Sequence, residues 1–428
     1  MRSPDTVAAP PPVALPGARY AVIVLTAMNL LNYLDRYVPS AVKGMFQADL
    51  GLTDAQTSYP LTAFVVVYML TSPVFGALAD RWPRRFLIAG GVALWSLATA
   101  GAALATGFWT FLLARALVGV GEAAYATLAP GVLSDVHAPE ARNRVLTLFY
   151  VAIPVGAALG FGVGGVLGKA LGWRAAFLAC GLPGLLAALL ALRIRDPREN
   201  AAAGEALRRG AHPPPPQEGS AEPPGWPHAL RVLRANRTYV VAVAGYTLVT
   251  FASGGMADWL PTWLARERGM DLARAGTLVG AVTVLGGLGG TATGGWIAER
   301  LKGRDGDPYL ATSAFTMIPA ALLAAAALLA PGTVAPVVLV GAAQFFLWCY
   351  NGPINTLIAN STDADLRARA FSLSILCIHL FGDAISPPIL GAVSDATGNL
   401  TLALGIVPVA LLAGAGVWLR GWTRSRAT

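Results

Sequence analysis

The chain has 428 residues, of which 55% are hydrophobic and only 13% are charged. A soluble domain carries about 25% charged residues and a membrane-crossing helix needs about 20 apolar ones, so this composition excludes a soluble enzyme and provides for about a dozen spans. The net charge of +8 does not indicate nucleic acid binding, because arginine-rich cytoplasmic loops give a membrane protein the same balance. The three cysteines and four histidines lack the spacing of a disulfide framework or a metal site.

The first 18 residues predict a disordered tail, because they are proline-rich and lack the basic start and short apolar core of a signal peptide. Twelve apolar segments of spanning length follow, and each predicts a transmembrane helix. The expected fold class is therefore an all-α membrane protein with twelve transmembrane helices. The segments begin near Tyr20, Gln56, Phe86, Phe108, Val145, Trp173, Tyr239, Ala275, Tyr309, Val334, Ala370 and Leu400.

A change of composition divides the twelve spans into six and six. Residues 195–236 contain HPPPPQEGSAEPPGWP and predict a proline-stiffened cytoplasmic linker. We therefore expect one six-helix bundle at 19–194, a second at 237–420 and a C-terminal tail at 421–428. The end of the linker, HALRVLRANR, fits either a solvated segment or a short basic helix on the membrane surface.

A repeated pattern indicates that the two halves are related. Residues 76–81 and 295–300 both read as a glycine, three further residues, an acid and an arginine, once in each half and at the end of a predicted span. Two bundles in one register are typical of transporters whose substrate site lies between the halves.

Arginine and lysine are distributed unequally across the membrane. Most of the 31 lie on the side that would hold both termini, which places both termini in the cytoplasm. The many arginines and few lysines are typical of a GC-rich bacterial genome, so we expect a multi-pass protein of a bacterial inner membrane. The opposite side holds only Lys43, Lys169, Arg174, Arg266, Arg268 and Arg274.

Charged residues also lie inside predicted spans, where each costs at least ~2.5 kcal/mol unless it is paired or faces water. A helix rise of about 1.5 Å per residue places Asp35, Arg36 and Arg115 about 9 Å from the external ends of spans one and four. Glu122 lies two turns deeper than Arg115, on the same face. We therefore expect the charges of these two spans to meet. Asp383, in span eleven, is a further intramembrane charge.

Two interpretations of this cluster stay open. One is a fixed ion-pair network that holds span one against span four. In the other, Asp35 as primary proton acceptor and Glu122 as second take up protons and release Arg36 and Arg115, which bind an anionic head group. Asn32, one turn before Arg36, belongs with these substrate-anchoring residues. The proton gradient would then drive transport without any cofactor or metal.

Several motifs resemble the major facilitator superfamily and, within it, the spinster family. GALADRWPRR, residues 76–85, resembles the cytoplasmic loop signature of the superfamily, and the spinster resemblance rests on NYLDRY, RALVGVGEA, WRAAFLACGLPG and HLFGDAISPPILGAVSD. The resemblance implies that spans one, four, seven and ten line a central cavity in which the charges face water. It also implies transport of lipids with small anionic heads, such as lysophospholipids and sphingosine phosphate, driven by protons in bacterial relatives.

The second half does not repeat the charges of the first. His379 and Asp383 lie one turn apart in span eleven and fit either a proton relay or a satisfied structural pair. Contacts with the substrate are expected from polar side chains of spans seven and ten, namely Tyr246, Thr250, Asn351 and Asn355.

The two repeated loop motifs predict a latch at the cytoplasmic end. An acid at a helix end can pair with nearby arginines, and glycines let two backbones approach closely. The resemblance implies that this latch stabilises the outward-open state, and the alternative is that the motifs only set the topology. The latch residues are Gly76, Asp80, Arg81, Arg84, Arg85, Gly295, Glu299 and Arg300.

The sequence GFGVGG, residues 160–165, matches a dinucleotide-binding pattern but lies inside an apolar span instead of between a strand and a helix. The surrounding run also resembles an antiporter signature of the superfamily, except that Phe161 replaces a proline, so exchange and symport both stay open. We interpret the glycines as close helix packing at Gly156, Gly160, Gly164 and Gly168.

These observations predict a secondary active transporter that works by alternating access, coupled to protons, for a lipid or amphipathic substrate with an anionic head group. The alternative is a symporter or antiporter of a soluble organic anion or sugar phosphate, because an arginine in the cavity suits either head group. A channel would need a continuous pore, and an intramembrane enzyme would need a nucleophile and a base in one span. The expected partners are the lipid bilayer, the substrate and protons, without nucleic acid, and the expected state is a monomer.

Overall fold

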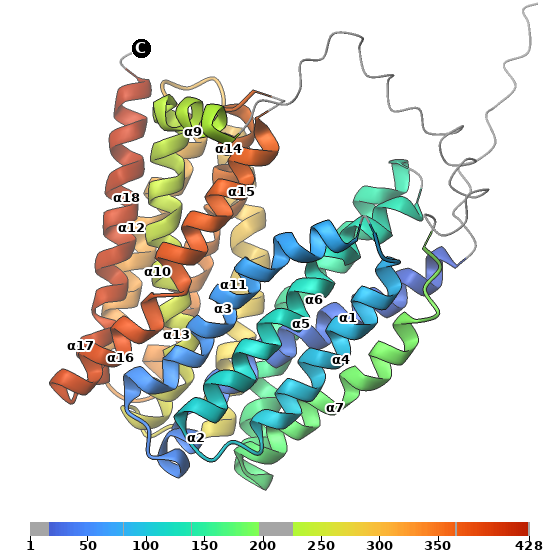
Figure 1. Ribbon diagram of the computed structural model, residues 1–428. Coiled ribbons are helices and arrows are strands. Elements are labelled where there is room, and N and C mark those ends of the chain that lie inside the picture. The colour runs from blue at the N-terminus through green and yellow to red at the C-terminus, as the bar shows by residue number, and fades with distance from the viewer. Residues whose placement is uncertain (1–16, 80, 138, 197–225, 364–365, 427–428) are drawn as a thin grey trace, which may run out of the picture.

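The structure is a computed structural model, in which every regular element of the described residues is a helix. The helices form two bundles, the first from the chain up to residue 196 and the second from residue 226 onward (Figure 1). The predicted all-α fold is therefore confirmed. The structure describes residues 17–79, 81–137, 139–196, 226–363 and 366–426.

Local chemistry explains how the first bundle is divided into helices. Gly51, with φ of 62°, ends α2 in the left-handed conformation that glycine adopts readily, and a capping box of Thr53 and Gln56 begins α3. The helices of this bundle are α1 (Ala18–Ala41), α2 (Lys43–Leu50), α3 (Asp54–Leu78), α4 (Arg84–Ala102), α5 (Phe108–Asp135), α6 (Pro139–Leu171) and α7 (Trp173–Ala191).

In the second bundle, three of the predicted spans are divided into shorter helices. Span ten consists of α13 and α14, span eleven of α15, the π-helix η2 and α16, and span twelve of α17 and α18. The elements are α9 (Trp226–Ala235), α10 (Arg237–Arg266), α11 (Leu272–Leu301), α12 (Pro308–Leu329), α13 (Val334–Trp348), α14 (Asn351–Asn360), α15 (Arg367–Ile378), η2 (His379–Asp383), α16 (Ser386–Thr397), α17 (Leu400–Leu404) and α18 (Ile406–Ser425).

The helix starts lie close to the predicted ones, and the largest difference is at α6, which begins at Pro139 instead of near Val145. Two segments outside the expected bundles are also helical. The end of the linker forms α9, and α18 continues to Ser425, past the boundary expected at residue 420. Residues 1–16 of the predicted tail lie outside the described residues.

Among the described residues, eleven helical segments are long and apolar enough to cross a membrane. The remaining predicted span, α1, has 24 residues, which at about 1.5 Å per residue is also sufficient to span the hydrocarbon core. Its hydropathy is reduced by Asn29, Asn32 and Asp35, all of which are buried inside the protein. The polar residues of α1 therefore avoid lipid.

Glycines explain how α6 packs against α1. A Cβ on Gly156 would lie 2.6 Å from the backbone oxygen of Leu30, and a Cβ on Gly168 would lie 2.6 Å from a methyl carbon of Val42. Gly160 likewise faces the backbone of Leu34. The four-residue spacing of these glycines therefore serves close helix packing, as the sequence predicts, and not nucleotide binding.

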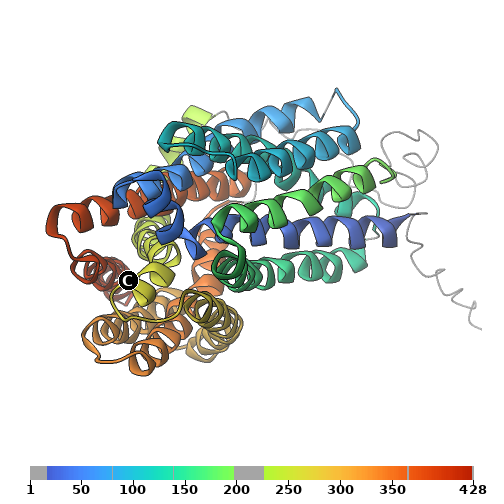
Figure 2. The same ribbon diagram turned by 90° about the horizontal axis from the view of Figure 1, so that it is seen from below.

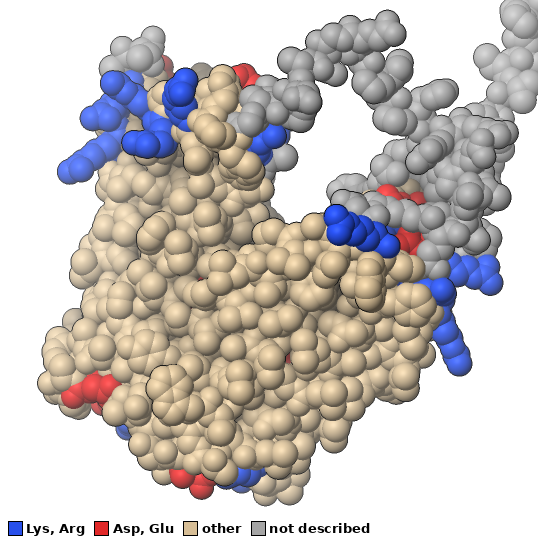
Figure 3. Space-filling model, viewed as in Figure 1, with Lys and Arg blue, Asp and Glu red and all other residues tan. Residues whose placement is uncertain are grey.

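The two bundles meet at one end and diverge toward the other. Figure 1 shows them together near α2 and α16 and apart toward α9 and the C-terminus. In Figure 2 the helices of the first bundle run lengthwise, while several of the second are seen nearly end-on. The space-filling view is hollowed between the bundles at the diverging end (Figure 3). Contacts of α6 with α11 and of α3 with α16 join the bundles.

The two ends of the molecule differ in charge. The end at which the bundles diverge carries the exposed side chains of Arg19, Arg193, Arg234 and Arg424, which lie at or next to the ends of α1, α7, α9 and α18, and we call it the arginine-rich end. The end at which the bundles meet, next to α2, is called the closed end.

Candidate functional site

Charges on α1 and α5 form a cluster inside the first bundle. Arg36 Nε lies 2.7 Å from Glu122 Oε2, and Arg115 Nη1 lies 3.8 Å from Asp35 Oδ1. The meeting of spans one and four that the helix rise predicts is therefore observed. The proton and substrate roles of these residues stay predictions.

The side chains of the cluster are less exposed to solvent than the sequence leads us to expect. Asp35 and Arg115 are each 1% exposed and Glu122 is 0% exposed, whereas the side chain of Arg36 is 21% exposed. The expectation that all four face a water-filled cavity is thus corrected for three of them. The reason is that α3 covers the cluster, with the ring centre of Phe64 lying 5.0 Å from Arg36 Cζ and 5.6 Å from Arg115 Cζ.

Neighbouring helices hold the cluster in place. Thr99 on α4 donates a hydrogen bond of 2.5 Å to Asp35 Oδ2. Gly119 lets α5 approach α3 closely, because a Cβ there would lie 2.5 Å from the backbone oxygen of Phe64. Asp35 is therefore positioned by α4 through Thr99 and by α5 through Arg115.

The hydrogen-bonding capacity of the cluster is incompletely used. Within the described part of the chain, both Nη atoms of Arg115 are buried without a hydrogen-bond partner, whereas the side chain of Asn32 is hydrogen-bonded to Glu122. A buried polar group without a partner costs about 1–3 kcal/mol, and a purely structural network would be expected to satisfy such groups. Both interpretations of the cluster, a fixed ion-pair network and a proton-linked release of the arginines, therefore stay open.

The polar residues expected in the second bundle lie together, because Tyr246 is hydrogen-bonded to Asn355 and Tyr350 connects Tyr246 with Thr250. Asn355 Nδ2 on α14 donates to the backbone oxygen of Asn351 at 2.7 Å, and the ring centre of Tyr246 lies 5.3 Å from that of Tyr350. Thr250 is buried, and a Cβ on Gly382 would lie 3.1 Å from its Cβ. These contacts place Thr250 at the interface of α10 with η2.

His379 and Asp383 lie on the π-helix η2, with His379 Nδ1 3.0 Å from both carboxylate oxygens of Asp383. Their side chains are 34% and 27% exposed. Single π-helical turns inside α-helices are frequent at functional sites. The pair that the sequence predicts is formed, and its role as a relay or a structural contact stays open.

In this conformation, Arg84 of the first-half latch motif is paired within its own bundle. Arg84 forms ion pairs with Asp135 at 2.8 Å and Asp196 at 2.6 Å, both in the first bundle. Arg85 Cζ lies 4.8 Å from the ring centre of the adjacent Phe86. Arg81 is exposed, and the predicted latch residue Asp80 lies outside the described residues.

The latch motif of the second half is also engaged locally. Glu299 pairs with Lys302 at 2.6 Å, and Arg300 Cζ lies 4.3 Å from the ring centre of Trp296. A Cβ on Gly295 would meet nothing within 4 Å. The expected close backbone approach at this glycine is therefore wrong for this conformation.

The corresponding glycine of the first half behaves in the same way. A Cβ on Gly76 would meet only the methyl carbon of Thr127, at 3.9 Å, so the expected close backbone approach is wrong here too. The physical reason is that the bundles diverge at the end where both motifs lie. Stabilisation of the outward-open state by the latch stays a prediction.

A buried ion pair joins the two bundles at the closed end. Lys43 of α2 pairs with Asp258 of α10, and the two residues are 1% and 3% exposed. Ser40 and Ser58 donate hydrogen bonds of 3.0 and 2.9 Å to the same carboxylate. Lys43 Nζ also lies 3.9 Å from the ring centre of Trp259. Donors of the first bundle thus surround a carboxylate of the second.

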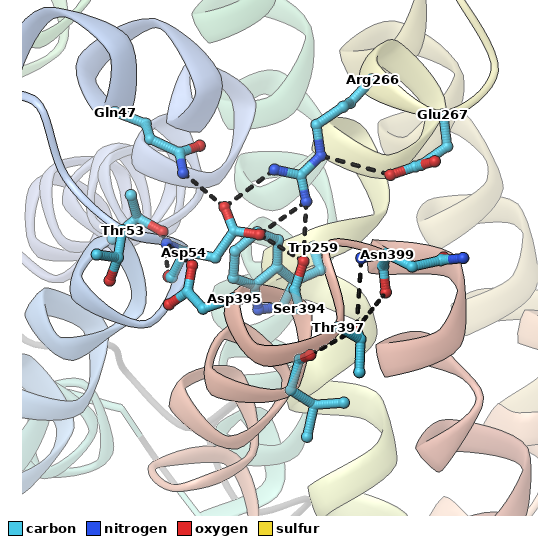
Figure 4. A network of polar contacts seen from close by, with 12 residues as sticks. Gln47, Thr53, Asp54, Trp259, Arg266, Glu267, Ser394, Asp395, Thr397 and Asn399 are labelled. Atoms are coloured by element: carbon cyan, nitrogen blue, oxygen red, sulfur yellow. Dashed lines mark hydrogen bonds and ion pairs between the residues drawn. The ribbon is translucent and has the colours of Figure 1, made fainter.

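A second network crosses the closed end beside the first (Figure 4). Arg266 donates from both Nη atoms to the carboxylate of Asp54, at 3.0 and 2.8 Å, and Ser394 donates to it at 2.5 Å. Asp395 accepts from the backbone N–H groups of Asp54 and Ala55, at 2.7 and 2.9 Å. A carboxylate of the second bundle therefore caps the N-terminus of α3 in the first.

A small pocket connects the closed end with the charge cluster. Its lining includes Arg36 and Arg115 of the cluster together with Lys43 and Asp258 of the closed end. The arginine partners of the candidate proton-binding groups and the contacts of the closed end therefore line one pocket.

Sequence reasoning missed the residues of the closed end. Lys43 and Arg266 entered only as positive charges on the external side. Asp258 lies inside predicted span seven, so the criterion that selected Asp35 would also have selected it. Asp395 carries no such signal, because a charged residue near the end of a span is ordinary.

Comparison with known proteins decides the family. A sequence model described as Major Facilitator Superfamily matches residues 25–387. Protein spinster homolog 1 of Homo sapiens is 33% identical over 395 residues, which cover 87% of this chain and 72% of that protein. The chain belongs to the spinster family of the major facilitator superfamily.

A second relative and a solved structure agree with this assignment. Protein spinster of Drosophila melanogaster is 32% identical over 391 residues, covering 88% of this chain and 62% of that protein. The crystal structure of a bacterial homolog to the human lysosomal transporter spinster, in an inward-facing and unoccupied conformation, has a TM-score of 0.78 at 22% identity and covers 97% of both chains. The twelve-helix architecture expected from the sequence is thus confirmed, and this spinster-family protein is a membrane transporter and not an enzyme.

Proposed function

We propose that this spinster-family protein is a proton-coupled transporter of a lipid or amphipathic substrate with an anionic head group, such as a lysophospholipid. The observation that carries the proposal is the pairing of the partly exposed Arg36 with the buried Glu122, next to the pair of Asp35 and Arg115. A guanidinium group binds carboxylate and phosphate in the same geometry. When its carboxylate partner takes up a proton, the guanidinium becomes free for a head group.

Proton uptake is assigned to Asp35 first and to Glu122 second. An arginine partner and a hydrogen bond stabilise a buried carboxylate as an anion, and loss of either favours its protonation. Protonation of Asp35 weakens its hold on Arg115, and protonation of Glu122 weakens its hold on Arg36. Because Arg36 is the partly exposed member of the cluster, it is the first contact for the head group.

The orientation follows from the charge distribution. The arginine-rich end faces the cytoplasm of a bacterium by the positive-inside rule, so the conformation described above is open to the cytoplasm. Alternating access then requires the contacts of Lys43 with Asp258 and of Asp54 with Arg266 to break while the arginine-rich ends of the bundles approach. The protein carries out this cycle as a monomer.

The experiment that tests the proposal is substrate uptake into proteoliposomes with an imposed pH gradient. We expect gradient-driven uptake of a lysophospholipid by the wild-type protein. Asp35→Asn removes the proton acceptor without changing the size of the side chain, so we expect uptake to fall to the level of liposomes without protein. The matched control is Asp305→Asn, whose carboxylate is 87% exposed.

Two results would contradict parts of this proposal. Uptake by Asp35→Asn that still follows the pH gradient would refute the proton role of Asp35. If the pH gradient drove uptake of a sugar phosphate but not of the lysophospholipid, the substrate would belong to the alternative class of soluble anions. A guanidinium group can bind the head group of either class.

A further inference from the structure

A groove lies at the arginine-rich end of the second bundle, apart from the charge cluster on α1 and α5. It has a volume of about 480 Å³ and opens between the end of α9, the start of α10 and the end of α18. Its lining consists of Arg234, Arg237, Val240, Val241 and Arg424. Three cations and two apolar side chains therefore surround one recess.

The three arginines of this groove are uncompensated. All three are exposed, and none forms an ion pair with a carboxylate within the described ranges of the chain. Arg426, two residues beyond Arg424, shows the contrast, because it lies 3.8 Å from a carboxylate oxygen of Asp305. Figure 3 shows Lys and Arg side chains gathered at this end of the second bundle. The recess is therefore complementary to an anion.

The apolar part of the groove continues into the membrane-spanning part of α10. Val240 is 44% exposed, and Val241 packs closely against α18, because a Cβ on Gly421 would lie 2.7 Å from Val241 Cγ1. Gly421 precedes Arg424 by one helical turn, so the close approach of the two helices brings Arg424 toward Arg237. Val240 and Val241 follow Arg237 along α10, toward the apolar middle of that helix.

The helix α9 has the composition of a segment that lies at a membrane surface. Its buried residues are Ala229 and Leu233, whereas Trp226 and Leu230 are 50% and 39% exposed. Exposed arginines occupy the same short helix. A basic helix with exposed tryptophan and leucine partitions to the head-group region of a bilayer. The groove therefore opens beside a helix of the kind that lies among lipid head groups.

We propose that this groove binds the head group of an anionic membrane phospholipid. Its phosphate contacts Arg234, Arg237 and Arg424, and the first carbons of its acyl chains lie along Val240 and Val241. A soluble phosphate would use the arginines but not the valines, and for that reason the groove is assigned to a lipid. The bound lipid is part of the membrane around the second bundle and not the transported substrate.

The test is native mass spectrometry of the full-length protein in detergent, titrated with phosphatidylglycerol or with phosphatidylcholine of the same acyl chains. We expect the wild-type protein to retain phosphatidylglycerol in preference to phosphatidylcholine. The affinity of the variant Arg234→Gln/Arg237→Gln/Arg424→Gln for phosphatidylglycerol should be lower than that of the wild-type protein by about tenfold or more. The reason is that each basic residue at the surface attracts anionic lipids. The matched control, Arg19→Gln/Arg193→Gln/Arg195→Gln, removes three exposed arginines from the first bundle.

Each outcome decides the proposal. Equal retention of the two lipids by the wild-type protein, or an equal loss of phosphatidylglycerol binding in both triple variants, would overturn it. Displacement of phosphatidylglycerol by millimolar inorganic phosphate would show that the groove binds a free anion, and this result would also overturn the proposal. If the triple variant does not fold, the binding of phosphatidylglycerol is measured on the single variant Arg424→Gln. Weaker binding by this variant, together with the preference of the wild-type protein for phosphatidylglycerol over phosphatidylcholine, then supports the proposal, and unchanged binding overturns it.

Discussion

The contact between Lys43 and Asp258 shows what a single pair of residues does at the closed end. Both charges are withdrawn from water, at 1% and 3% exposed, so each depends on the other and on the hydrogen bonds of Ser40 and Ser58. Removal of one partner of a buried ion pair costs about 3–5 kcal/mol, whereas removal of both leaves no unpaired charge. The pair therefore stabilises the closed end only while the bundles meet.

Lys43→Met is predicted to open the closed end. The readout is the rate at which a membrane-impermeant maleimide labels a cysteine placed at Leu61, in the pocket beside Lys43, in a background without native cysteines. We expect labelling to accelerate about tenfold or more, because Asp258 is left buried without a cation. The double variant Lys43→Met/Asp258→Asn should return toward the rate of the wild-type protein.

The control for this prediction is Lys169→Met, which removes the exposed partner of Asp271 at the same interface. An exposed ion pair contributes only about 0–1 kcal/mol, so this variant should label like the wild-type protein. If Lys43→Met labelled no faster than Lys169→Met, the buried pair would have no part in closure.

At the scale of helices, glycine decides which pairs pack closely. One face of α6 carries Gly156, Gly160 and Gly164, and α1 lies against that face without room for a side chain. Gly162, on the same helix, faces away, because a Cβ there would meet only the hydroxyl of Thr277 at 3.9 Å. Membrane helices associate through such small residues because they gain no hydrophobic free energy from leaving lipid.

Gly160→Ala and Gly162→Ala are a matched pair of variants on α6. The Cβ of the first would overlap the backbone of Leu34, so α6 and α1 must separate, and overpacking of this kind costs about 1–3 kcal/mol. The second adds a methyl group without a clash and gains about 0.5–1 kcal/mol of helix propensity. We expect thermal unfolding in detergent to occur at a lower temperature for Gly160→Ala only. Equal unfolding temperatures of the two variants would contradict the close packing of α6 on α1.

At the scale of the whole molecule, the conformation depends on a balance between the two ends. The closed end holds two networks of charged and polar groups between the bundles, whereas Arg84 and Glu299 of the latch motifs pair within their own bundles. Rigid bundles that separate at one end approach at the other. Weakening of the networks at the closed end therefore shifts the population toward the opposite conformation.

Asp54→Ala/Asp395→Ala tests this balance, because it removes two carboxylates that join the bundles without touching the charge cluster. The variant loses the cap that Asp395 forms on α3 and the ion pair of Asp54 with Arg266. Together these losses destabilise the closed end by about 2 kcal/mol, which changes a two-state equilibrium roughly 30-fold. Spin labels at residues 193 and 304, one at the arginine-rich end of each bundle, should report a larger population with a short distance. The control Asp305→Ala should keep the distance distribution of the wild-type protein. An unchanged distribution in the double variant would show that the two carboxylates do not influence the conformation.

The charge cluster shows how much of the site can be inferred without coordinates. A charge inside an apolar run is costly enough to stand out, and the rise of an α-helix fixes its depth, so the meeting of Asp35 with Arg115 follows from the sequence. The pairing of Arg36 with Glu122 does not follow, because the helix rise places Glu122 two turns deeper. The burial of Asp35 and Arg115 does not follow, because it depends on the ring of Phe64 and on Thr99, which belong to two other helices.

The sequence by itself determined the spans, their division into two bundles and the residues that lie deep in the first bundle, because hydropathy, helix rise and charge act along a single helix. Only the tertiary structure decided which end is closed, and it assigned Lys43, Asp258, Asp54 and Asp395 to that closure. Each of these contacts joins residues of different bundles, far apart in the chain. Their pairing depends on how two rigid bodies are placed against one another, and no local pattern of residues encodes that placement.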